Sequence, residues 1–449
     1  MILPENFCER MKDILGDEYP AFAQALTDGQ ASKGLFCARK MSARKLQEHP
    51  ELALSGIPFT KNGFLFEAEH IGRHPLHHAG AFYVQDPSAQ ATVSAVEIKP
   101  GAKVLDCCAA PGGKTVALSA AVGDEGFVLS NEIDSSRAKK LAQNVERMGL
   151  RNTLVTSLTT EELSERYREY FDIVLADAPC SGEGMFRKYE TAQSGWNPGM
   201  VKKCADLQKK ILDNVAFTLA PGGILIYSTC TFSPEEDEWQ TEAFLCRHPE
   251  FSLIKPSDAL DPYTRPGITE KTRDARRFYP HIYPGEGQYI AVMRKSEGQA
   301  DTRLPASFAQ PPTREELTVI SDFLKEYTTL DPAALSFVRS PDGLRALSCA
   351  HPYPQSGAVS YGVLFGSVEK GIFRPHHNLF SAYGEFFKNR LDLPCPSPEI
   401  DAYLKGNTLN VPNMPNGWCC VLAHGCPLGG GKVVSGTLKN HYPKGLRNL

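Results

Sequence analysis

The 449-residue sequence lacks several features that would place it in familiar classes of protein. It has no apolar run near the ~18 residues of a membrane-spanning helix, and its start has neither the basic head nor the apolar core of a signal peptide. It also lacks a large net charge, because 48 Lys and Arg residues nearly balance 52 Asp and Glu residues. This balance excludes attachment to nucleic acid through bulk charge, although not through a local basic patch. We expect a cytoplasmic protein without a membrane anchor.

The cysteines lack a regular spacing. There are 13 of them, an odd number in a long chain, which is typical of reduced thiols in a cytosol. Cys419, Cys420 and Cys426 lie near His424, but their spacing fits no paired-ligand pattern for a metal. We therefore expect these cysteines to be buried on strands, and no metal site.

Composition and the pattern of helix and strand signals along the chain predict four domains. Residues 1–90 form a small N-terminal domain, and residues 91–295 alternate strand and helix signals. Residues 296–393 begin with a polar, proline-containing linker and continue as a small α+β domain. Residues 394–449 are rich in Gly, Pro and Asn and contain short apolar strands.

Basic residues gather in the first and last domains. Residues 30–47 contain no acid and carry Lys33, Arg39, Lys40, Arg44 and Lys45. A second group follows at Arg73, His74, His77 and His78. After Asp401 there is no acid, and the cations are Lys405, Lys432, Lys439, Lys444 and Arg447. The N-terminal cluster fits either a solvated surface or a surface that contacts phosphates.

The central domain is predicted to be a doubly wound α/β sheet. Apolar strands are expected at residues 103–107, 126–133, 171–176, 223–227 and 288–294. Helices are expected at residues 115–122, 135–150 and 200–219, and a capping pattern predicts a further helix that begins at Ser233. Such alternation is typical of a mostly parallel sheet, in which ligands bind at the carboxyl ends of the strands.

The segment after the first of these strands, DCCAAPGGKT, can hold a ligand through its backbone. Gly112 and Gly113 let amide groups approach a ligand, and the helix that follows favours negative charge at its start. Gly-Lys-Thr resembles part of a Walker loop, but Cys108 stands where that motif requires glycine. The dinucleotide pattern G-x-G-x-x-G is also absent, which argues against a nicotinamide-dependent dehydrogenase. A phosphate loop and a purely structural turn are the less favoured alternatives.

Polar and reactive side chains also follow the other strands. Glu132 can accept hydrogen bonds from the two hydroxyls of a ribose. Asp177 and Cys180 lie in the segment DAPCSGEG, and Cys230 lies in YSTCTF. Cys230 alone would be interpreted as an inert buried thiol. Two thiols and a carboxylate at neighbouring strand ends, however, suit addition of sulfur to an electron-poor ring.

These segments resemble a known family. DCCAAPGGKT, DAPCSGEG followed by RK, and YSTCTFSPEEDE are similar to the signature segments of the Sun-type RNA cytosine carbon-5 methyltransferases. HHAGAFYVQDPSAQ and the ending CPLGGGKVVSGTLKNHYPKGLR resemble the bacterial small-subunit rRNA methyltransferase F group. The resemblance covers almost the whole chain. It implies a Rossmann-like class I methyltransferase core with a small N-terminal domain, a C-terminal α+β domain and a PUA-like RNA-binding domain.

The resemblance also implies a role for individual residues. S-adenosylmethionine would be bound by Glu132, Asp177 and the loop Cys108, Ala109, Ala110, Pro111, Gly112, Gly113 and Lys114. Cys230 would be the nucleophile, Cys180 would assist product release, and Asp177 would contact the base. The family usually has an aspartate near the adenine, and Thr159 stands at that position here. The adenine would then be held more weakly or by backbone amides.

The expected partner is RNA, and we expect the protein to be a monomer. The small-subunit 16S rRNA, free or in the assembled subunit, is favoured, with tRNA as the alternative. Contacts to RNA are expected from Arg187, Lys188, Lys432, Lys439 and Lys444. A non-catalytic RNA-binding assembly factor is a less favoured function. A DNA methyltransferase would instead use Cys180 as its nucleophile.

Overall fold

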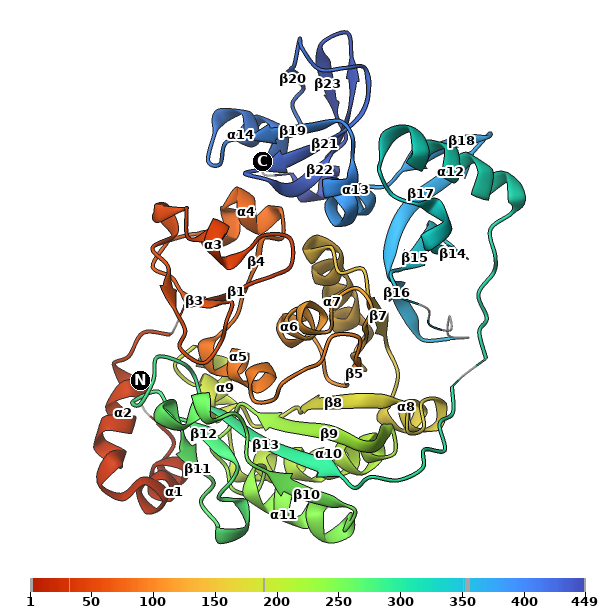
Figure 1. Ribbon diagram of the computed structural model, residues 1–449. Helices are drawn as coiled ribbons and strands as arrows, with labels where there is room; N and C mark the ends of the chain where they lie inside the picture. Colours follow the sequence, from red (N-terminus) through yellow and green to blue (C-terminus); the bar gives the residue numbers. More distant parts are fainter. Residues whose placement is uncertain are drawn as a thin grey trace.

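A ten-stranded sheet forms the centre of the computed structural model (Figure 1). The structure describes residues 3–31, 33–188, 190–304, 306–349, 351 and 356–447. The sheet has the order β11-β12-β13-β9-β8-β5-β6-β7-β16, and β10 pairs with β13. Its central strands are β5 (Lys103–Asp106), β6 (Phe127–Asn131), β7 (Thr153–Thr156), β8 (Phe171–Asp177), β9 (Leu219–Thr229) and β13 (Gln288–Lys295). The strands from β7 to β9 run parallel and β13 is antiparallel, which confirms the doubly wound core.

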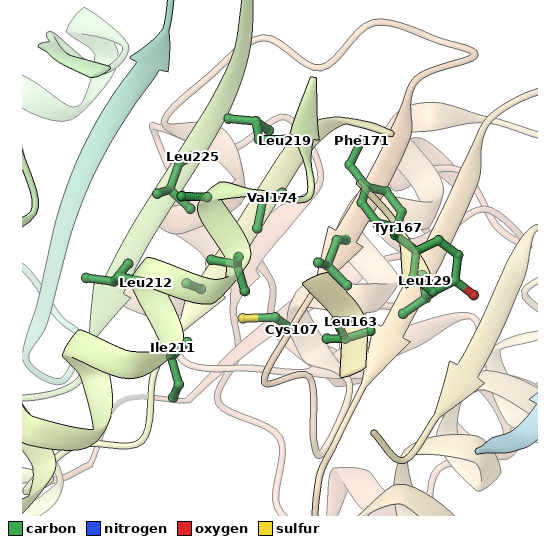
Figure 2. Close-up of a cluster of buried hydrophobic side chains, with 14 of the residues drawn as sticks. Cys107, Leu129, Leu163, Tyr167, Phe171, Val174, Ile211, Leu212, Leu219 and Leu225 are labelled. Carbon is green, nitrogen blue, oxygen red and sulfur yellow. The ribbon is translucent and has the colours of Figure 1, made fainter. Parts of the chain in front are cut away.

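Helices cover both faces of this sheet. One face carries α5 (Pro87–Ser94), α6 (Gly113–Val122) and α7 (Ser135–Met148), and the other carries α8 (Thr160–Arg166), α10 (Pro198–Ala216) and α11 (Glu238–Arg247). Figure 2 shows the second face, where Ile211 and Leu212 of α10 and Leu163 of α8 lie over the strands beside Val174. Each such side chain, once buried, contributes roughly 1.5–3 kcal/mol to folding. The predicted stop at Gly149 is confirmed, because this residue ends α7 in the left-handed conformation.

The helix predicted from Ser233 is wrong in its start, because α11 begins only at Glu238. Residues 234–237 form a turn instead. The acids that looked like a capping pattern are buried and bind elsewhere: Glu236 accepts a hydrogen bond from the backbone N–H of Ser181 at 2.9 Å, and Glu238 pairs with Arg277. These contacts hold the segment against the sheet in a turn, and α11 begins at the last of the acids, Glu238.

The N-terminal region has two parts with different packing partners. The helices α1 (Glu5–Leu15) and α2 (Tyr19–Thr27) pack on the central domain through Phe7, Met11 and Phe22. A small sheet follows, in the order β2-β3-β1-β4. Its strands are β1 (Gly34–Cys37), β2 (Ser55–Gly56), β3 (Gly63–Leu65) and β4 (Phe82–Val84). This sheet shares one hydrophobic cluster with the C-terminal domain, toward which it points in Figure 1.

Two residues of the N-terminal basic cluster fit neither interpretation given above. Arg39 forms an ion pair with Asp124 of the central domain. The ammonium of Lys40 donates to the Ser381 hydroxyl at 2.9 Å and to the carbonyl oxygen of Ala79, and burial lowers its pKa to about 8. These two cations therefore join domains of the protein to one another.

The region after the linker contains α12 (Arg314–Tyr327) and a four-stranded sheet in the order β14-β15-β17-β18. Its strands are β14 (Ser336–Ser340), β15 (Gly343–Leu347), β17 (Val363–Glu369) and β18 (Ile372–Pro375). One further strand, β16 (Ala358–Tyr361), leaves this region and pairs with β7 at the edge of the central sheet (Figure 1). The expected third domain therefore completes the sheet of the second.

The C-terminal domain is a five-stranded sheet in the order β19-β21-β22-β23-β20, with α13 (His377–Tyr383) and α14 (Pro398–Leu404) beside it. Its strands are β19 (Arg390–Leu393), β20 (Leu409–Asn410), β21 (Gly417–Ala423), β22 (Cys426–Val434) and β23 (Thr437–Asn440). Cys419, Cys420 and Cys426 are buried on β21 and β22, as the strand interpretation predicts. Among the described residues, no helix is both long and apolar enough to cross a membrane.

Candidate active site

A cavity of about 500 Å³ opens at the carboxyl ends of the parallel strands. It gathers side chains from the ends of the five strands β5 to β9 and from α10. The lining includes Cys108, Ala110, Glu132, Ile133, Leu158, Thr159, Asp177, Cys180, Leu207, Lys210 and Cys230. Five of the residues expected to bind the donor therefore share the cavity with the two cysteines expected to act on the base. Its lining residues do not include Ala109, Pro111, Gly112, Gly113 and Lys114.

The loop after β5 turns sharply before α6. Gly112 has a φ of +115°, a value that residues other than glycine rarely adopt. A Cβ on Gly113 would lie about 3.0 Å from the side chain of Gln85, so the turn packs tightly on the segment after β4. The Pro111 carbonyl accepts hydrogen bonds from Asn144 at 2.9 Å and from Tyr83 at 3.3 Å. The loop is thus held rigidly with its backbone at the cavity.

Glu132 lies at the end of β6 with a side chain that is only 3% exposed. One oxygen accepts the backbone N–H of Asp134 at 3.0 Å, and the other pairs with Arg137 at 3.1 Å. Each carboxylate oxygen has two lone pairs, so both can still accept a hydroxyl from a ligand. The neighbouring Ile133 is 66% exposed and presents apolar surface beside it.

Thr159 lines the cavity, but its hydrogen-bonding groups are used to start α8. Its hydroxyl accepts the N–H of Glu162 at 3.2 Å, and its own N–H donates to the Glu162 carboxylate at 2.9 Å. The N–H of Leu158 donates to the side chain of Asn131 at 2.9 Å. The backbone amides of these two residues are therefore engaged within the protein, contrary to the idea that they replace the missing aspartate.

Asp177 is oriented by three side chains at the end of β8. It receives hydrogen bonds from Lys114 at 2.7 Å, Ser228 at 2.6 Å and Gln288 at 3.3 Å. Burial alone would lower the pKa of Lys114, but the adjacent Asp177 carboxylate outweighs it and raises that pKa. The last residue of the glycine loop and the acid after β8 therefore form one ion pair beside the cavity.

Cys180 and Cys230 follow the neighbouring parallel strands β8 and β9 and meet at the cavity. Their sulfur atoms lie 3.2 Å apart, and the backbone N–H of Cys230 donates to the sulfur of Cys180 at 3.3 Å. The Cys230 sulfur and burial raise the pKa of Cys180 well above its ordinary value. Cys180 therefore keeps its proton at neutral pH and can donate it toward Cys230.

Two buried glutamates that sequence reasoning missed hold the cysteine loops. Glu236 accepts from the Ser181 N–H and hydroxyl and from Gln208, and burial raises its pKa to about 7. Glu183 accepts the N–H of Phe232 at 3.1 Å. For Glu236 the signal in the sequence was the group of acids after an apolar strand, which was attributed to a helix cap. Glu183 lies in the segment DAPCSGEG, where only Asp177 and Cys180 were given roles.

Comparison with protein families gives three consecutive matches along the chain. The model described as 16S rRNA methyltransferase RsmB/F matches residues 93–294. The N-terminal domain of 16S rRNA methyltransferase RsmF matches residues 3–87, and the methyltransferase RsmF PUA domain matches residues 390–448. Ribosomal RNA small subunit methyltransferase F of Cronobacter sakazakii is 30% identical over 410 residues, which cover 88% of this chain and 84% of that protein.

The chain belongs to the RsmB/F family of 16S rRNA methyltransferases.

Other RsmB/F relatives and solved structures agree with this assignment. The protein of the same name from Vibrio vulnificus (strain YJ016) is 28% identical over 467 residues, covering 99% of this chain and 97% of that protein. A methyltransferase homologue from Pyrococcus horikoshii is 28% identical with a TM-score of 0.57, covering 65% of this chain and 95% of that one. NSun6 from the same organism, solved with SFG, is 20% identical with a TM-score of 0.59 and shows the same fold over 66% of this chain and 99% of that one.

This member of the RsmB/F family is an S-adenosylmethionine-dependent RNA methyltransferase, and its cavity fits that donor. Cys108 and Ala110 bring the loop after β5 to the cavity, and Glu132 supplies the carboxylate that a ribose diol requires. Ile133 and Leu158 offer apolar surface for an adenine ring. The volume of the cavity lies within the usual range for sites that bind small molecules and cofactors.

The expected RNA contact by Arg187 is wrong. Its side chain is 5% exposed and pairs with Glu286 at 2.6 Å, and it also donates to the carbonyl oxygens of Ala25 and Gly285. The guanidinium therefore fastens α2 to the central domain and is not presented to a phosphate. Lys188, Lys432, Lys439 and Lys444 are exposed.

Proposed function

We propose that this chain transfers a methyl group from S-adenosylmethionine to carbon 5 of a cytosine in 16S rRNA, through a covalent bond between Cys230 and the base. The observation that carries the proposal is the placement of Cys230, Cys180 and Asp177 in the same cavity as Glu132. The names of the curated relatives support small-subunit rRNA as the substrate.

Cys230 suits the role of nucleophile better than Cys180. The raised pKa of Cys180 keeps that thiol protonated, so it can donate a hydrogen bond to a thiolate at Cys230 across 3.2 Å. A thiol that holds its proton is a poor base for carbon 5. Cys180 therefore suits protonation of the departing Cys230 sulfur, or the ordering of a water that removes the carbon-5 proton.

The reaction follows from these positions. Attack by the Cys230 thiolate forms a bond between sulfur and carbon 6 and moves electron density onto carbon 5. Carbon 5 of an unactivated cytosine is too poor a nucleophile to take a methyl group. The bound donor supplies a methyl group on a sulfonium, which is strongly electrophilic. Asp177, oriented by Lys114 and Ser228, can accept a hydrogen bond from the exocyclic amine of the ring. Loss of the carbon-5 proton restores the ring double bond and expels the Cys230 sulfur.

The base must leave its stack to reach the cavity, which costs a few kcal/mol when it is paired. Contacts to phosphates supply affinity and register without reading the sequence. Lys432, Lys439, Lys444 and Lys188 remain our candidates for these contacts. Lys432 lies on β22 with its ammonium 5.8 Å from the ring of Trp418, so a base-stacking surface and a cation adjoin on the C-terminal sheet.

The test uses 16S rRNA that carries 5-fluorocytosine, because fluorine cannot leave as a proton and the adduct is trapped. The full-length protein should form an adduct that survives denaturing electrophoresis, and Cys230→Ala should abolish both the adduct and methyl transfer. Cys180→Ala should still form the trapped adduct. With unmodified 16S rRNA, from which the unaltered protein is released after transfer, the Cys180→Ala adduct should persist. If Cys180→Ala alone abolishes the adduct, the roles of the two thiols are reversed.

Bisulfite mapping in cells that lack the protein tests the substrate. Loss of 5-methylcytosine from 16S rRNA is expected. Loss from tRNA instead would show that tRNA is the substrate, and no loss in either RNA would favour a non-catalytic assembly factor.

A further inference from the structure

Glu183 is a fully buried carboxylate that joins three separate segments of the chain. Its Oε2 accepts the backbone N–H of Phe232 at 3.1 Å. Its Oε1 accepts the indole N–H of Trp196 at 2.9 Å and pairs closely with the guanidinium of Arg10. Its side chain has no exposed surface. A charged group without water needs such partners, because an unpaired buried carboxylate is costly.

The same segment is bonded to the backbone around Cys230. The N–H of Gly184 donates to the carbonyl oxygen of Cys230 at 3.0 Å. Two residues further on, the N–H of Phe232 is held by Glu183. The hydroxyls of Ser181 and Thr231 lie 2.9 Å apart between these bonds. Residues 183 and 184 therefore fix the backbone directly after the residue that carries the sulfur, at the Cys230 carbonyl and at the Phe232 N–H.

Arg10 comes from the first helix of the chain. Within the part of the chain that the structure describes, it is the one cation that forms an ion pair with Glu183. Its guanidinium also lies 5.8 Å from the ring centres of Phe7 and Trp196. Phe7 in turn contacts Phe186 with ring centres 5.2 Å apart, so α1 is anchored against the loop after β8.

We infer that Arg10 is a positioning residue, which neutralises the Glu183 carboxylate so that Glu183 and Gly184 hold Cys230 in place for reaction. The inference rests on the proposed role of Cys230. It makes α1 a part of the catalytic unit, whereas the sequence offered, as one interpretation of the N-terminal basic cluster, a surface that contacts phosphates. A cation that acts in this way changes the rate of the reaction and leaves RNA binding unchanged.

Lys12 provides a matched control. It lies on the same helix two residues after Arg10, is exposed, and has its ammonium 5.5 Å from the ring of Tyr19. If α1 were mainly a surface for phosphates, Lys12 would be as well placed as Arg10 to contact them. Lys12→Gln should therefore distinguish a role in RNA binding from a role in the active site.

The experiment measures transfer of labelled methyl groups to 16S rRNA at saturating RNA, together with RNA affinity at several salt concentrations. Arg10→Ala should lower kcat by about 10- to 100-fold, the usual effect of displacing a reacting group by about 1 Å, with RNA affinity within about twofold. Arg10→Lys should be intermediate, because it keeps the charge and loses the planar fork. Lys12→Gln should match the unaltered protein in both measurements.

A double-mutant cycle shows whether Arg10 acts through Glu183. In a Glu183→Gln background, Arg10→Ala should change the rate by less than about threefold, because no buried charge remains to be neutralised. Glu183→Gln also protects the test against simple misfolding, since the amide can still accept the Phe232 N–H. Unfolding midpoints of all the variants identify any loss of rate that comes from loss of folded protein.

Several results would overturn the inference. One is an Arg10→Ala variant that loses RNA affinity in a salt-dependent way and keeps its rate at saturation. Another is an equal effect of Arg10→Ala in both backgrounds. Cys230→Ala is measured beside them, and if it retains methyl transfer the proposed function fails while the Arg10 and Glu183 cycle can still be evaluated.

Discussion

Buried carboxylates organise the active site at the scale of single residues. Asp106, at the end of β5, accepts a hydrogen bond from the Thr115 hydroxyl at 2.7 Å, and burial raises its pKa to about 7. Glu236 has the same raised value for the same reason. Asp106 directly precedes Cys107 in the cavity wall, and Glu236 holds Ser181, the neighbour of the cavity residue Cys180. Their protonation therefore links the pH of the solution to the stability of the site.

The first prediction concerns Asp106→Asn. An unfolded aspartate titrates near pH 4, and the folded protein holds this proton up to about pH 7, so the folded state binds more protons between these values. The free energy of unfolding must therefore fall as pH rises from about 4 to about 7, by roughly 4 kcal/mol for this group. Asp106→Asn should flatten that part of the profile, as measured by urea unfolding between pH 4.5 and 7.5.

Asp134→Asn serves as the control because the pKa of Asp134 is shifted in the opposite direction to that of Asp106. Hydrogen bonds from Ser136 and from the backbone of Arg137 lower the pKa of Asp134, so its contribution is lost as pH falls. Asparagine still caps a helix. A profile for Asp106→Asn that runs parallel to that of the unaltered protein would refute the role assigned to burial.

Local sequence was sufficient for the residues at strand ends and insufficient for their distant partners. Glu132, Asp177, Cys180 and Cys230 could be brought together because parallel strands end at one edge of a sheet. Arg187 was misassigned because its partner Glu286 lies 99 residues away, and no local pattern announces such a pair. Glu183 and Glu236 were missed for the same reason.

At the scale of elements, α10 carries information that the strand-end analysis did not use. Lys202, Lys203, Lys209 and Lys210 are exposed on it. A spacing of seven residues is close to two helical turns, so these lysines form a stripe along one face. Leu207 and Lys210 line the cavity itself. One end of the stripe, at Lys210, therefore borders the cavity.

The second prediction is that this stripe contacts phosphates. A Lys202→Gln, Lys203→Gln and Lys209→Gln triple variant should bind RNA more weakly, and the slope of log affinity against log salt should fall by about 2. Binding is measured by fluorescence anisotropy from 50 to 300 mM salt, which is about the range in which such slopes are resolved. Lys99 is exposed and lies just before β5, at the amino ends of the parallel strands, so Lys99→Gln should leave the slope unchanged. An unaltered slope in the triple variant would contradict the prediction.

Element boundaries show where periodicity is reliable and where it is not. The helices α6, α7 and α10 were predicted within a few residues. In α7 the apolar positions repeat at helical spacing, whereas α6 was predicted from a run of small residues between two strands. The segment after Ser233 has the capping pattern of a helix start, but the helix begins only at Glu238. Its acids are bound by Ser181, Thr229 and Arg277, and these tertiary contacts override local preference.

At the scale of the molecule, the N-terminal sheet and the C-terminal domain behave as one packed body. Leu35 and Phe82 of the first share a hydrophobic cluster with Leu428 and Val421 of the second. The thiol of Cys426 also lies 3.7 Å from the carbonyl oxygen of Ala79. About 300 residues separate these two domains along the chain, so their contact could not be predicted from local sequence patterns.

The third prediction is that these two domains lose protection together. Leu428→Ala leaves a cavity in the shared cluster and should lower the free energy of unfolding by about 3 kcal/mol. Hydrogen exchange should then increase in β1–β4 as well as in β20–β23. Leu212→Ala, in the cluster under α10, should increase exchange in the central sheet and leave β1–β4 unaffected. Faster exchange confined to the C-terminal strands after Leu428→Ala would show that the domains are independent.

Strand β16 has a consequence for the order in which this protein can be made. It pairs with β7, and the carbonyl oxygen of Gly357 accepts the N–H of Ser157, two residues before Thr159 in the wall of the donor cavity. A ribosome that translates this message must therefore pass codon 361 before the sheet acquires its last strand. A nascent chain that stops at the linker has Cys180 and Cys230, to which we assign the chemistry, and an unfinished edge. Such a truncated product should be a poor catalyst, and the exposed side of β7 would offer a site for aggregation.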